Sequence, residues 1–400
     1  MAKKKPLLQA QEYAKTAFIN FLVLGVAAAI MLTAAIGLLF PKKNPIVALD
    51  KLNEAYDERK YGPRDKDIFN ISKERMEVEK MGKGMYQRFQ KQMLMARDPD
   101  LGHANRPNSS VKDEMVKDGK FVYKAEYNID DKGRRKTERQ SEKQGFVALF
   151  GGEFVFGKGL NDNETLSSMI EKFSKRFNAY NYGLIGAGTN HMLAMTAKKD
   201  FKGEIKSSKG IWVYVYDDDH LRRTIGANEY LDEYPDAPWY VLDGDEVLRV
   251  GSMRSRNKLI QWAYEFANRF ELKVPPFISE EHVKLTCELV EDSKAKFIKN
   301  YPNTKYVVLF HPLGKKNLPS NDYDYRRGLM NCLTKKNIEY IEYERMYEDT
   351  PLGKKDELFI DYTDFPSAKG NEELAKRIVE TLEDQHKSTS PSELPPESNK

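Results

Sequence analysis

One glycine-rich stretch has the layout in which α/β enzymes present a reactive side chain. Residues 149–165 read LFGGEFVFGKGLNDNET, an apolar run followed by a glycine-rich corner and then by helix-forming residues. A Ser or Cys at such a corner acts as a nucleophile when an imidazole lies beside it. The corner residue is instead Glu153, and no Ser or Cys occurs within ten positions on either side. The sequence therefore raises the question of whether the strand–turn–helix layout of an active site is present without a catalytic side chain.

Other polar residues follow apolar runs in the same way and are candidates for the same site. They lie in NYGLIGAG (181–188), YDDDHLRR (216–223), KYVVLFH (305–311) and DYTDFPSAKGN (361–371). The candidate binding residues, besides Glu153, are Gly183, Asp217, Asp218, His220, His311 and Asp361. Asp364 is, together with Glu153, a candidate catalytic acid or base.

Residues 146–384 alternate between apolar runs and amphipathic stretches. FVALFGG, GIWVYVYDDD and IEYIEYE are typical of strands, whereas NETLSSMIEKFSKRF and FPSAKGNEELAKRIVETLE are typical of helices. This alternation predicts a three-layer α/β domain with a parallel sheet. Because ligands bind at the carboxyl ends of parallel strands, we expect Glu153, Gly183, Asp217 and Asp364 to converge on that face.

The order of these stretches resembles the SGNH (GDSL-like) hydrolase family, in its membrane-anchored branch. The resemblance rests on GGEFVFGKG, ETLSSMIEKF, NYGLIGAG and PSAKGN, with RPNSSV and VYKAEYNIDDKGRR upstream, and covers about residues 99–384. It implies a flavodoxin-like fold. It also implies that the nucleophilic Ser of the family falls on Glu153 and the catalytic His on Phe365. By the same resemblance, the second block matches Gly183, the third-block Asn falls on Asp217 or Asp218, and the neighbouring acid is Asp361 or Asp364.

These substitutions predict the loss of ordinary ester hydrolysis, because nucleophile and base are both missing and either loss alone costs several orders of magnitude in rate. The resemblance then favours a binding or scaffolding module outside the membrane, whose cleft holds a glycan, a peptide or an envelope protein. Two alternatives stay open. One is an active carbohydrate O-acyl esterase or acyltransferase that uses Glu153 and Asp364, and the other is a structural component of the cell envelope.

The candidate side chains also have purely structural interpretations. Glu153 can accept backbone N–H bonds from the turn that follows it, as acidic residues do at helix N-termini, or it can bind a polar ligand or cation. The acidic run 217–219 can form ion pairs with the basic residues after it instead of a ligand site. His191 faces the same rim and is expected to be structural. The stretch YPDAPWY (234–240) is expected to be an aromatic loop, with carbohydrate stacking as the alternative to loop packing.

Residues 17–40 are predicted to anchor the chain in a membrane. The run contains no charged residue and one strongly polar residue, Asn20. As a helix it would be about 36 Å long, enough to span a hydrocarbon core of roughly 30 Å. The lysine-rich leader 1–16 favours a cytoplasmic N-terminus. We therefore expect a single-pass protein of the inner membrane with its main domain on the extracytoplasmic side.

The segments around the main domain are charged or of low complexity. Residues 44–145 are expected to form a helical arm, with helices over 46–60 and 72–97, a loop over 101–111 and a hairpin over 120–135 that turns at 131–133. Residues 385–400, HKSTSPSELPPESNK with the preceding Gln, are expected to be a disordered tail.

Composition excludes several classes of protein. A hydrophobic fraction of 40% is enough for a core and excludes general disorder. The net charge of +4, from 65 basic and 61 acidic residues, does not indicate nucleic-acid binding. Cys287 and Cys332 have no metal-ligand spacing and are interpreted as two small buried apolar residues, with a disulfide as the alternative. We expect neither a cofactor nor a structural metal.

Overall fold

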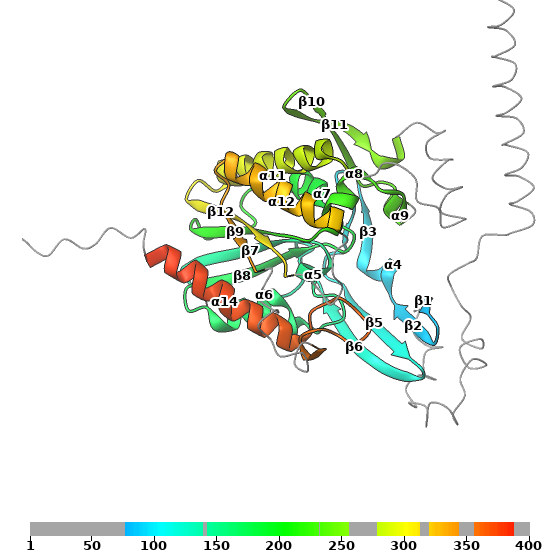
Figure 1. Cartoon of the computed structure of the whole chain (residues 1–400). Helices are drawn as coiled ribbons and strands as arrows, with labels where there is room; N and C mark the ends of the chain where they lie inside the picture. The colour runs from blue at the N-terminus through cyan, green and yellow to red at the C-terminus, as the bar shows by residue number, and fades with distance from the viewer. Residues whose placement is uncertain are drawn as a thin grey trace, which may run out of the picture.

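The computed structural model describes residues 77–138, 142–231, 233–255, 278–312, 320–343 and 356–387. At its centre is a five-stranded parallel sheet in the order β13–β12–β9–β7–β8 (Figure 1). Its strands are β7 (Gly145–Gly151), β8 (Phe177–Gly183), β9 (Gly210–Tyr216), β12 (Thr304–Phe310) and β13 (Tyr340–Glu342). Counted along the chain, this is the order 2-1-3-4-5 of flavodoxin-like sheets. The predicted α/β class with a parallel sheet is confirmed.

Helices cover both faces of this sheet and give the domain three layers (Figure 1). Side chains alternate across a strand, so Val147 and Leu149 of β7 pack on one face, whereas Phe146 and Phe150 pack on the other. The first face is covered by α6 (Leu166–Phe173) and α14 (Ala368–Lys387). The second is covered by α7 (Thr189–Thr196), α8 (Asp219–Ile225), α11 (Glu280–Asn300) and α12 (Ser320–Lys335).

A second, antiparallel sheet precedes the parallel one in the chain. The expected helical arm is therefore wrong for this part of the protein. Its order is β1–β2–β5–β6, with β1 (Glu77–Gly82), β2 (Met85–Phe89), β5 (Ser110–Lys117) and β6 (Lys120–Asn128). The predicted helix over 72–97 is wrong from residue 77 onward, apart from the short α4 (Lys91–Leu94). Met81, Met85 and Phe89 do have helical spacing. Gly82 and Gly84 interrupt it, however, and Gly84 adopts a φ of 67° in the β1–β2 turn.

The expected loop and hairpin of this region also need correction. Residues 102–105 form β4 (Gly102–Asn105), which pairs with β3 (Met95–Asp98), so 101–111 is not all loop. The strand at 120–128 is confirmed, and the chain turns at 131–133 as predicted, where Ile129 forms an antiparallel bridge with Arg135. The long partner of this strand is, however, the upstream β5, through a turn at Asp118 and Gly119, both at positive φ. The antiparallel sheet packs on the parallel domain through Tyr127, whose ring meets that of Phe156 edge-on at 5.0 Å.

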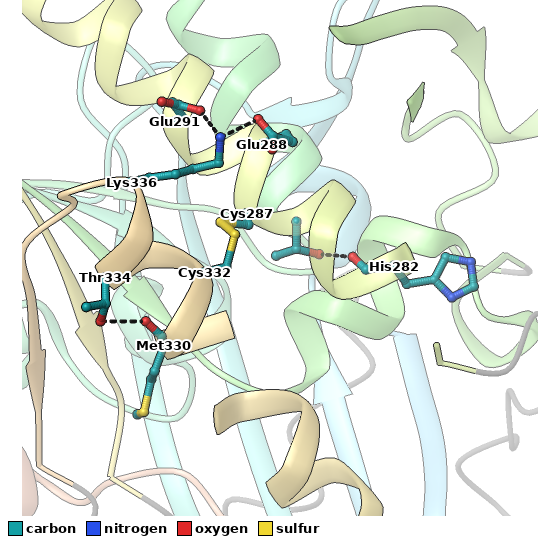
Figure 2. The surroundings of a disulfide bond; sticks show 9 residues. His282, Cys287, Glu288, Glu291, Met330, Cys332, Thr334 and Lys336 are labelled. Carbon is teal, nitrogen blue, oxygen red and sulfur yellow. Dashed lines mark hydrogen bonds and ion pairs between the residues drawn. A yellow bond between two sulfur atoms is a disulfide. The ribbon is translucent and has the colours of Figure 1, made fainter. Parts of the chain in front are cut away.

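A disulfide bond joins two helices of the second face. Cys287 of α11 and Cys332 of α12 are bonded, with their Cα atoms 6.3 Å apart (Figure 2). The interpretation of two separate apolar cysteines is therefore wrong, because the packing of α11 against α12 brings together residues that the sequence cannot pair. Lys336 lies next to this junction, 2.9 Å from Glu288 and also paired with Glu291 (Figure 2).

The segment after α8 forms a short helix and a hairpin. The helix α9 (Asn228–Leu231) is followed by β10 (Pro238–Asp243) and β11 (Glu246–Ser252), which pair with each other (Figure 1). The expected aromatic loop 234–240 is thus a strand from Pro238 onward. Tyr240 is buried and packs against Leu289 of α11, which fits the packing interpretation of this stretch.

Several expectations fall on parts of the chain that are not described. These are the leader 1–16, the anchor 17–40, the helix over 46–60 and the tail from residue 388; α14 itself ends at Lys387. Within the described ranges, no helix has both the length and the apolar character needed to cross a membrane.

Candidate functional site at the corner after β7

The glycine-rich corner is a tight strand-to-helix turn packed onto β8. After β7 ends at Gly151, Gly152 leads into α5 (Glu153–Phe156), a single turn that ends at Gly157 with a φ of 81°. Gly151 pairs with Gly183, the last residue of β8. A Cβ atom on Gly183 would lie 2.2 Å from the backbone nitrogen of Phe156, so only glycine allows α5 to approach β8 this closely. Gly183 therefore serves close packing. Its N–H donates to Asn181 Oδ1 (2.9 Å) and so already has an acceptor within its own strand.

The Glu153 carboxylate is held on both of its oxygens. Arg223 Nη1 donates to Oε2 at 2.6 Å, and the backbone N–H of Gly186 donates to Oε1 at 3.1 Å. The side chain of Glu153 is only 12% exposed and that of Arg223 only 8%. Glu153 thus accepts a backbone N–H bond, as its structural interpretation predicts, but from the loop after β8 and not from the turn that follows it.

Arg223 ties the corner to the acidic run after β9. Its Nη1 also donates to the carbonyl of Ala187 (3.0 Å), and its Nη2 lies 3.8 Å from Asp219. Burial favours a neutral side chain, but the nearby carboxylates of Glu153 and Asp217 outweigh it and raise the pKa of Arg223. The guanidinium is therefore a permanent counter-ion at the point where a nucleophile would be needed.

Tyr234 covers the Gly186 side of the corner. A Cβ atom on Gly186 would lie 2.2 Å from the Tyr234 ring, so the ring rests directly on this glycine. The ring of His103 lies 4.7 Å from that of Tyr234, and His103 Nε2 donates to the carbonyl of Ile185 (2.7 Å). Tyr234 is 8% exposed. The backbone N–H that meets Glu153 is thus enclosed beneath an aromatic ring.

A second polar group lies buried behind the corner. His220 Nε2 is 3.0 Å from Asp217 Oδ2, although poorly aligned for a hydrogen bond, and His220 Nδ1 is 2.9 Å from the Tyr214 hydroxyl. Tyr214 in turn lies 2.7 Å from Thr189 Oγ1. Burial opposes ionisation of Asp217, but His220, Arg223 and His311 outweigh it and hold the pKa of this carboxyl well below its usual value. All four side chains are buried, so the group joins β9, α7 and α8 and exposes no hydroxyl to a substrate.

His311 and Asp218 are held by Arg326 of α12. Arg326 Nη1 donates to Asp218 Oδ2 (3.1 Å) and Nη2 donates to the carbonyl of His311 (2.8 Å). The His311 ring stacks on Phe154, the residue after Glu153, at 4.1 Å. Burial lowers the pKa of His311 to about 4, although Asp217 opposes the shift. At neutral pH His311 is an uncharged ring against the corner.

Phe365 also reaches the corner, whereas Asp361 does not. The Phe365 ring meets that of Phe154 edge-on at 5.7 Å, and Lys158 Nζ lies 5.6 Å from the Phe365 ring centre. Asp361 lies on an exposed turn next to Tyr362, which has a φ of 60° and is 65% exposed. Asp364 is partly buried beside Phe365. The strand ends thus bring together Glu153, Asp217, His220, His311 and Phe365, the last at the position where the resemblance implies a histidine.

Gly186, Tyr234 and Arg223 lie in stretches that the sequence singled out, but their contacts at the corner were not all predicted. Gly186 and Tyr234 act through contacts between distant loops, for which the sequence carries no signal. Arg223 lies in the basic stretch for which ion pairing was one interpretation, and its pairs with Glu153 and Asp219 bear that interpretation out. His191 is buried and accepts the N–H of Gly188 at Nδ1 (3.1 Å), which agrees with a structural role. Among the described residues, no group of three or more His, Cys, Asp or Glu side chains is placed to hold a metal ion.

Comparison with known proteins finds similarity at the level of the fold. No protein-family model matches the sequence, and no curated protein matches it. Similar solved structures include a lipase/acylhydrolase from Enterococcus faecalis (12% identity, TM-score 0.35, covering 60% of this chain and 96% of that chain). Another is a member of the lipolytic protein G-D-S-L family from Veillonella parvula DSM 2008 (11%, 0.37, 60% and 98%). A third is an acetyl xylan esterase from the rumen bacterium Butyrivibrio proteoclasticus (13%, 0.36, 69% and 68%). At identities and TM-scores this low, the strand order and parallel pairing of the chain itself establish its fold.

Proposed function

We propose that this protein is a membrane-anchored, SGNH-hydrolase-like module that does not hydrolyse esters and that binds or scaffolds a glycan or protein partner in the cell envelope. The observation that carries the proposal is the state of Glu153. Its two carboxylate oxygens are engaged by Arg223 and by the Gly186 N–H at the corner where a hydrolase of this fold type needs a free nucleophile.

The chemistry of the corner supports this proposal. Ester hydrolysis requires a hydroxyl or thiol, a base to remove its proton, and N–H donors that face the developing oxyanion. The corner offers a carboxylate instead of a hydroxyl, and Phe365 packs against the neighbouring Phe154 where a base is needed. The Gly186 N–H, a donor of the right kind, is already bonded to Glu153 and covered by Tyr234. A negatively charged intermediate would also meet the fixed charge of Glu153.

The anchor and the disulfide support a position outside the cytoplasm. The uncharged run 17–40 and the lysine-rich leader 1–16 fit a single span with a cytoplasmic N-terminus. Disulfides persist in oxidising compartments and are rare in the cytosol, so the bond between Cys287 and Cys332 fits an extracytoplasmic domain. In this arrangement residues 44–145 connect the anchor to the α/β domain, whose last helix α14 ends at Lys387, and the residues after it follow as a tail.

The activity test uses the full-length chain purified in detergent. We expect no turnover of p-nitrophenyl acetate or p-nitrophenyl butyrate above that of buffer with the same detergent. Glu153→Gln is the matched control, because an amide keeps the size of the side chain but cannot act as a nucleophile or a base. Saturable hydrolysis by the parent that Glu153→Gln abolishes, with the thermal unfolding curve unchanged, would reject the non-hydrolytic function in favour of a carboxylate mechanism.

The position in the membrane is tested separately. In spheroplasts of a Gram-negative host that expresses the full chain, added protease should degrade the α/β domain, while a cytoplasmic marker protein stays intact. Residues 1–16, carrying an epitope tag, should remain protected. Protection of the α/β domain together with the marker would reverse the proposed orientation.

A further inference from the structure

A cavity of about 370 Å³ lies beside the corner but apart from it. Its walls come from the β3–β4 hairpin, the turn at 131–134, the end of β8 and the segment after α7. It adjoins the corner only through Gly183 and Leu184; Glu153, Arg223 and Phe365 do not line it. The volume is within the range of pockets that hold small ligands. The cavity is therefore a candidate site separate from the corner at Glu153.

One buried polar atom in the wall of this cavity lacks a partner. Asn105, at the end of β4, is 5% exposed, and its Nδ2 donates to two carbonyls, those of Gly133 and Gly183, both at 3.1 Å. These two acceptors fix the orientation of the amide, since the flipped form would place its oxygen against both carbonyl oxygens. Oδ1 has no hydrogen-bond partner among the described residues. A buried acceptor of this kind costs free energy unless a donor reaches it.

The other polar groups of the wall indicate what kind of ligand fits the cavity. The described lining residues include four acidic and four basic side chains, among them the Asp98–Lys198 ion pair (2.8 Å), so the wall has no net charge. Glu204 Oε2 accepts from the Tyr182 hydroxyl (2.9 Å), and Arg134 Nη1 donates to that same hydroxyl (3.4 Å). Donors and acceptors thus both occur in this wall, and their charges balance, so a ligand without net charge matches it. Asn105 Oδ1 itself is fully buried and is not within reach of a ligand.

We propose that this cavity binds a neutral saccharide unit, whose hydroxyl groups pair with the Glu204 carboxylate and the Arg134 guanidinium of its wall. Each hydroxyl of a sugar both donates and accepts, which matches a wall where acceptors such as Glu204 stand next to donors such as Arg134. The apolar part of the wall, which includes Leu101 and Met195, covers the C–H faces of the ring. The inference deepens the proposed binding function by naming a ligand class, and it rests on that function only for its biological role.

Binding is tested with the full-length chain in detergent micelles, using cellobiose and N,N′-diacetylchitobiose as probes. We expect saturable binding of at least one disaccharide by isothermal titration calorimetry, with a dissociation constant of about 1 mM or below. Ala104→Trp, which places an indole in the cavity wall, should abolish binding, whereas the matched control Ala104→Ser should bind within about twofold of the parent. Glu204→Gln, which replaces a charged acceptor by a neutral one, should bind about fivefold more weakly.

A second measurement does not depend on any variant folding. With ¹³C-methyl methionine labelling, the methyl signal of Met195 in the cavity wall should shift on titration with the bound disaccharide. The signal of Met169, which packs under the opposite face of the sheet, should not move. Failure of both disaccharides to bind, or binding that leaves Met195 unmoved, would overturn the proposal. Binding of N-acetylalanine methylamide without either disaccharide would replace the saccharide by a peptide ligand. Because esterase assays enter none of these readouts, this inference and the non-hydrolytic function can fail separately.

Discussion

The corner at Glu153 and the cavity at Asn105 lie next to each other, but the first is closed by its own polar contacts and the second is open to a ligand. At the corner every oxygen of the Glu153 carboxylate has a donor, and Tyr234 covers the loop that supplies one of them. Beside the cavity, the buried oxygen of Asn105 has no donor among the described residues. Within the described part of the chain, unpartnered buried atoms also occur at the corner, among them Arg223 Nε and His220 Nε2, so the two places differ above all in the open volume of the cavity.

This difference shows that polar residues at the strand ends do not by themselves make a binding site. The order of the parallel strands brings polar residues to the strand ends in any flavodoxin-like sheet, and here those residues neutralise each other. Glu153, Arg223 and Asp219 form one connected group of charges, and Arg326 connects Asp218 to His311. The corner is therefore expected to respond to mutation as a structural element, and the cavity as a binding site.

Removal of the Arg223 guanidinium should have the largest effect on the corner. Arg223→Met leaves the carboxylates of Glu153 and Asp217 with little water and without their shared cation, so the free energy of unfolding should fall by about 4 kcal/mol. Urea denaturation of the full chain in detergent, followed by tryptophan fluorescence, measures this loss. The double variant Arg223→Met with Glu153→Gln should recover at least about 1 kcal/mol of this loss. Additive effects of the two changes would mean that the ion pair does not hold the corner.

Loss of the disulfide should have the next largest effect, and it should leave the cavity intact. Cys287 and Cys332 are 45 residues apart, and a cross-link over a loop of this size typically contributes about 3 kcal/mol. Cys287→Ala with Cys332→Ala should lower the free energy of unfolding by this amount under oxidising conditions. Disaccharide binding should stay within about twofold of the parent, because neither α11 nor α12 lines the cavity. Equal stability of the double variant and the parent would indicate that the bond does not form in the cell.

Mild acid should weaken the corner through His311. Its pKa is lowered to about 4 in the folded protein, from an ordinary 6.5, so the unfolded chain takes up the proton first as the pH falls. Stability is therefore complete above pH 7 and is lost as the pH falls through 6.5 toward 4, by about 2 kcal/mol between pH 7 and pH 5. Asp217, whose pKa is lowered, adds a loss only below its ordinary value of 3.8.

His311→Phe isolates this contribution. The substitution keeps a ring stacked on Phe154 but removes the titrating nitrogen, so the loss between pH 7 and pH 5 should shrink by most of that amount. A smaller dependence will remain, because burial also lowers the pKa of His103 and of His191. An unchanged pH dependence in His311→Phe would place the titrating group elsewhere in the molecule.

The sequence was sufficient for the parallel domain and insufficient for the region before it. From residue 146 onward, long apolar strands alternate with amphipathic helices, and these signals agree with the parallel sheet and its helices; the β10–β11 hairpin is the exception. Before it, Met81, Met85 and Phe89 repeat at a helical spacing by chance, and the decisive signals were Gly82 and Gly84, which favour a hairpin. The pairing of Cys287 with Cys332 depends on how α11 packs against α12, a tertiary contact that no local pattern encodes.

For the site, the sequence identified the chemically important position but not its partners. The order of the strand ends placed Glu153, Asp217 and His311 near one another, which the contacts through Arg223 and Phe154 bear out. It could not reveal that the Gly186 N–H meets Glu153 or that Tyr234 covers Gly186, since both contacts join loops that are distant in the sequence. Asn105 was not a candidate either, because an unpaired oxygen becomes visible only when all of its neighbours are placed.

The smallest effect is expected for Glu153→Ser on ester hydrolysis, although the sequence resemblance places the nucleophile at this position. Glu153→Ser restores a hydroxyl at the corner and frees the Gly186 N–H, yet hydrolysis of p-nitrophenyl acetate should stay at background, because the position where the resemblance implies a base holds Phe365. Adding Phe365→His supplies an imidazole beside the freed N–H, whose stabilisation of an oxyanion is worth roughly 3 kcal/mol per donor in well-formed sites. Tyr234 still covers Gly186 in that variant, so we expect only trace turnover, and an increase when Tyr234→Ala is added. Robust hydrolysis by Glu153→Ser alone would contradict this order, since it would mean that the corner already has a working base and an open path for substrate.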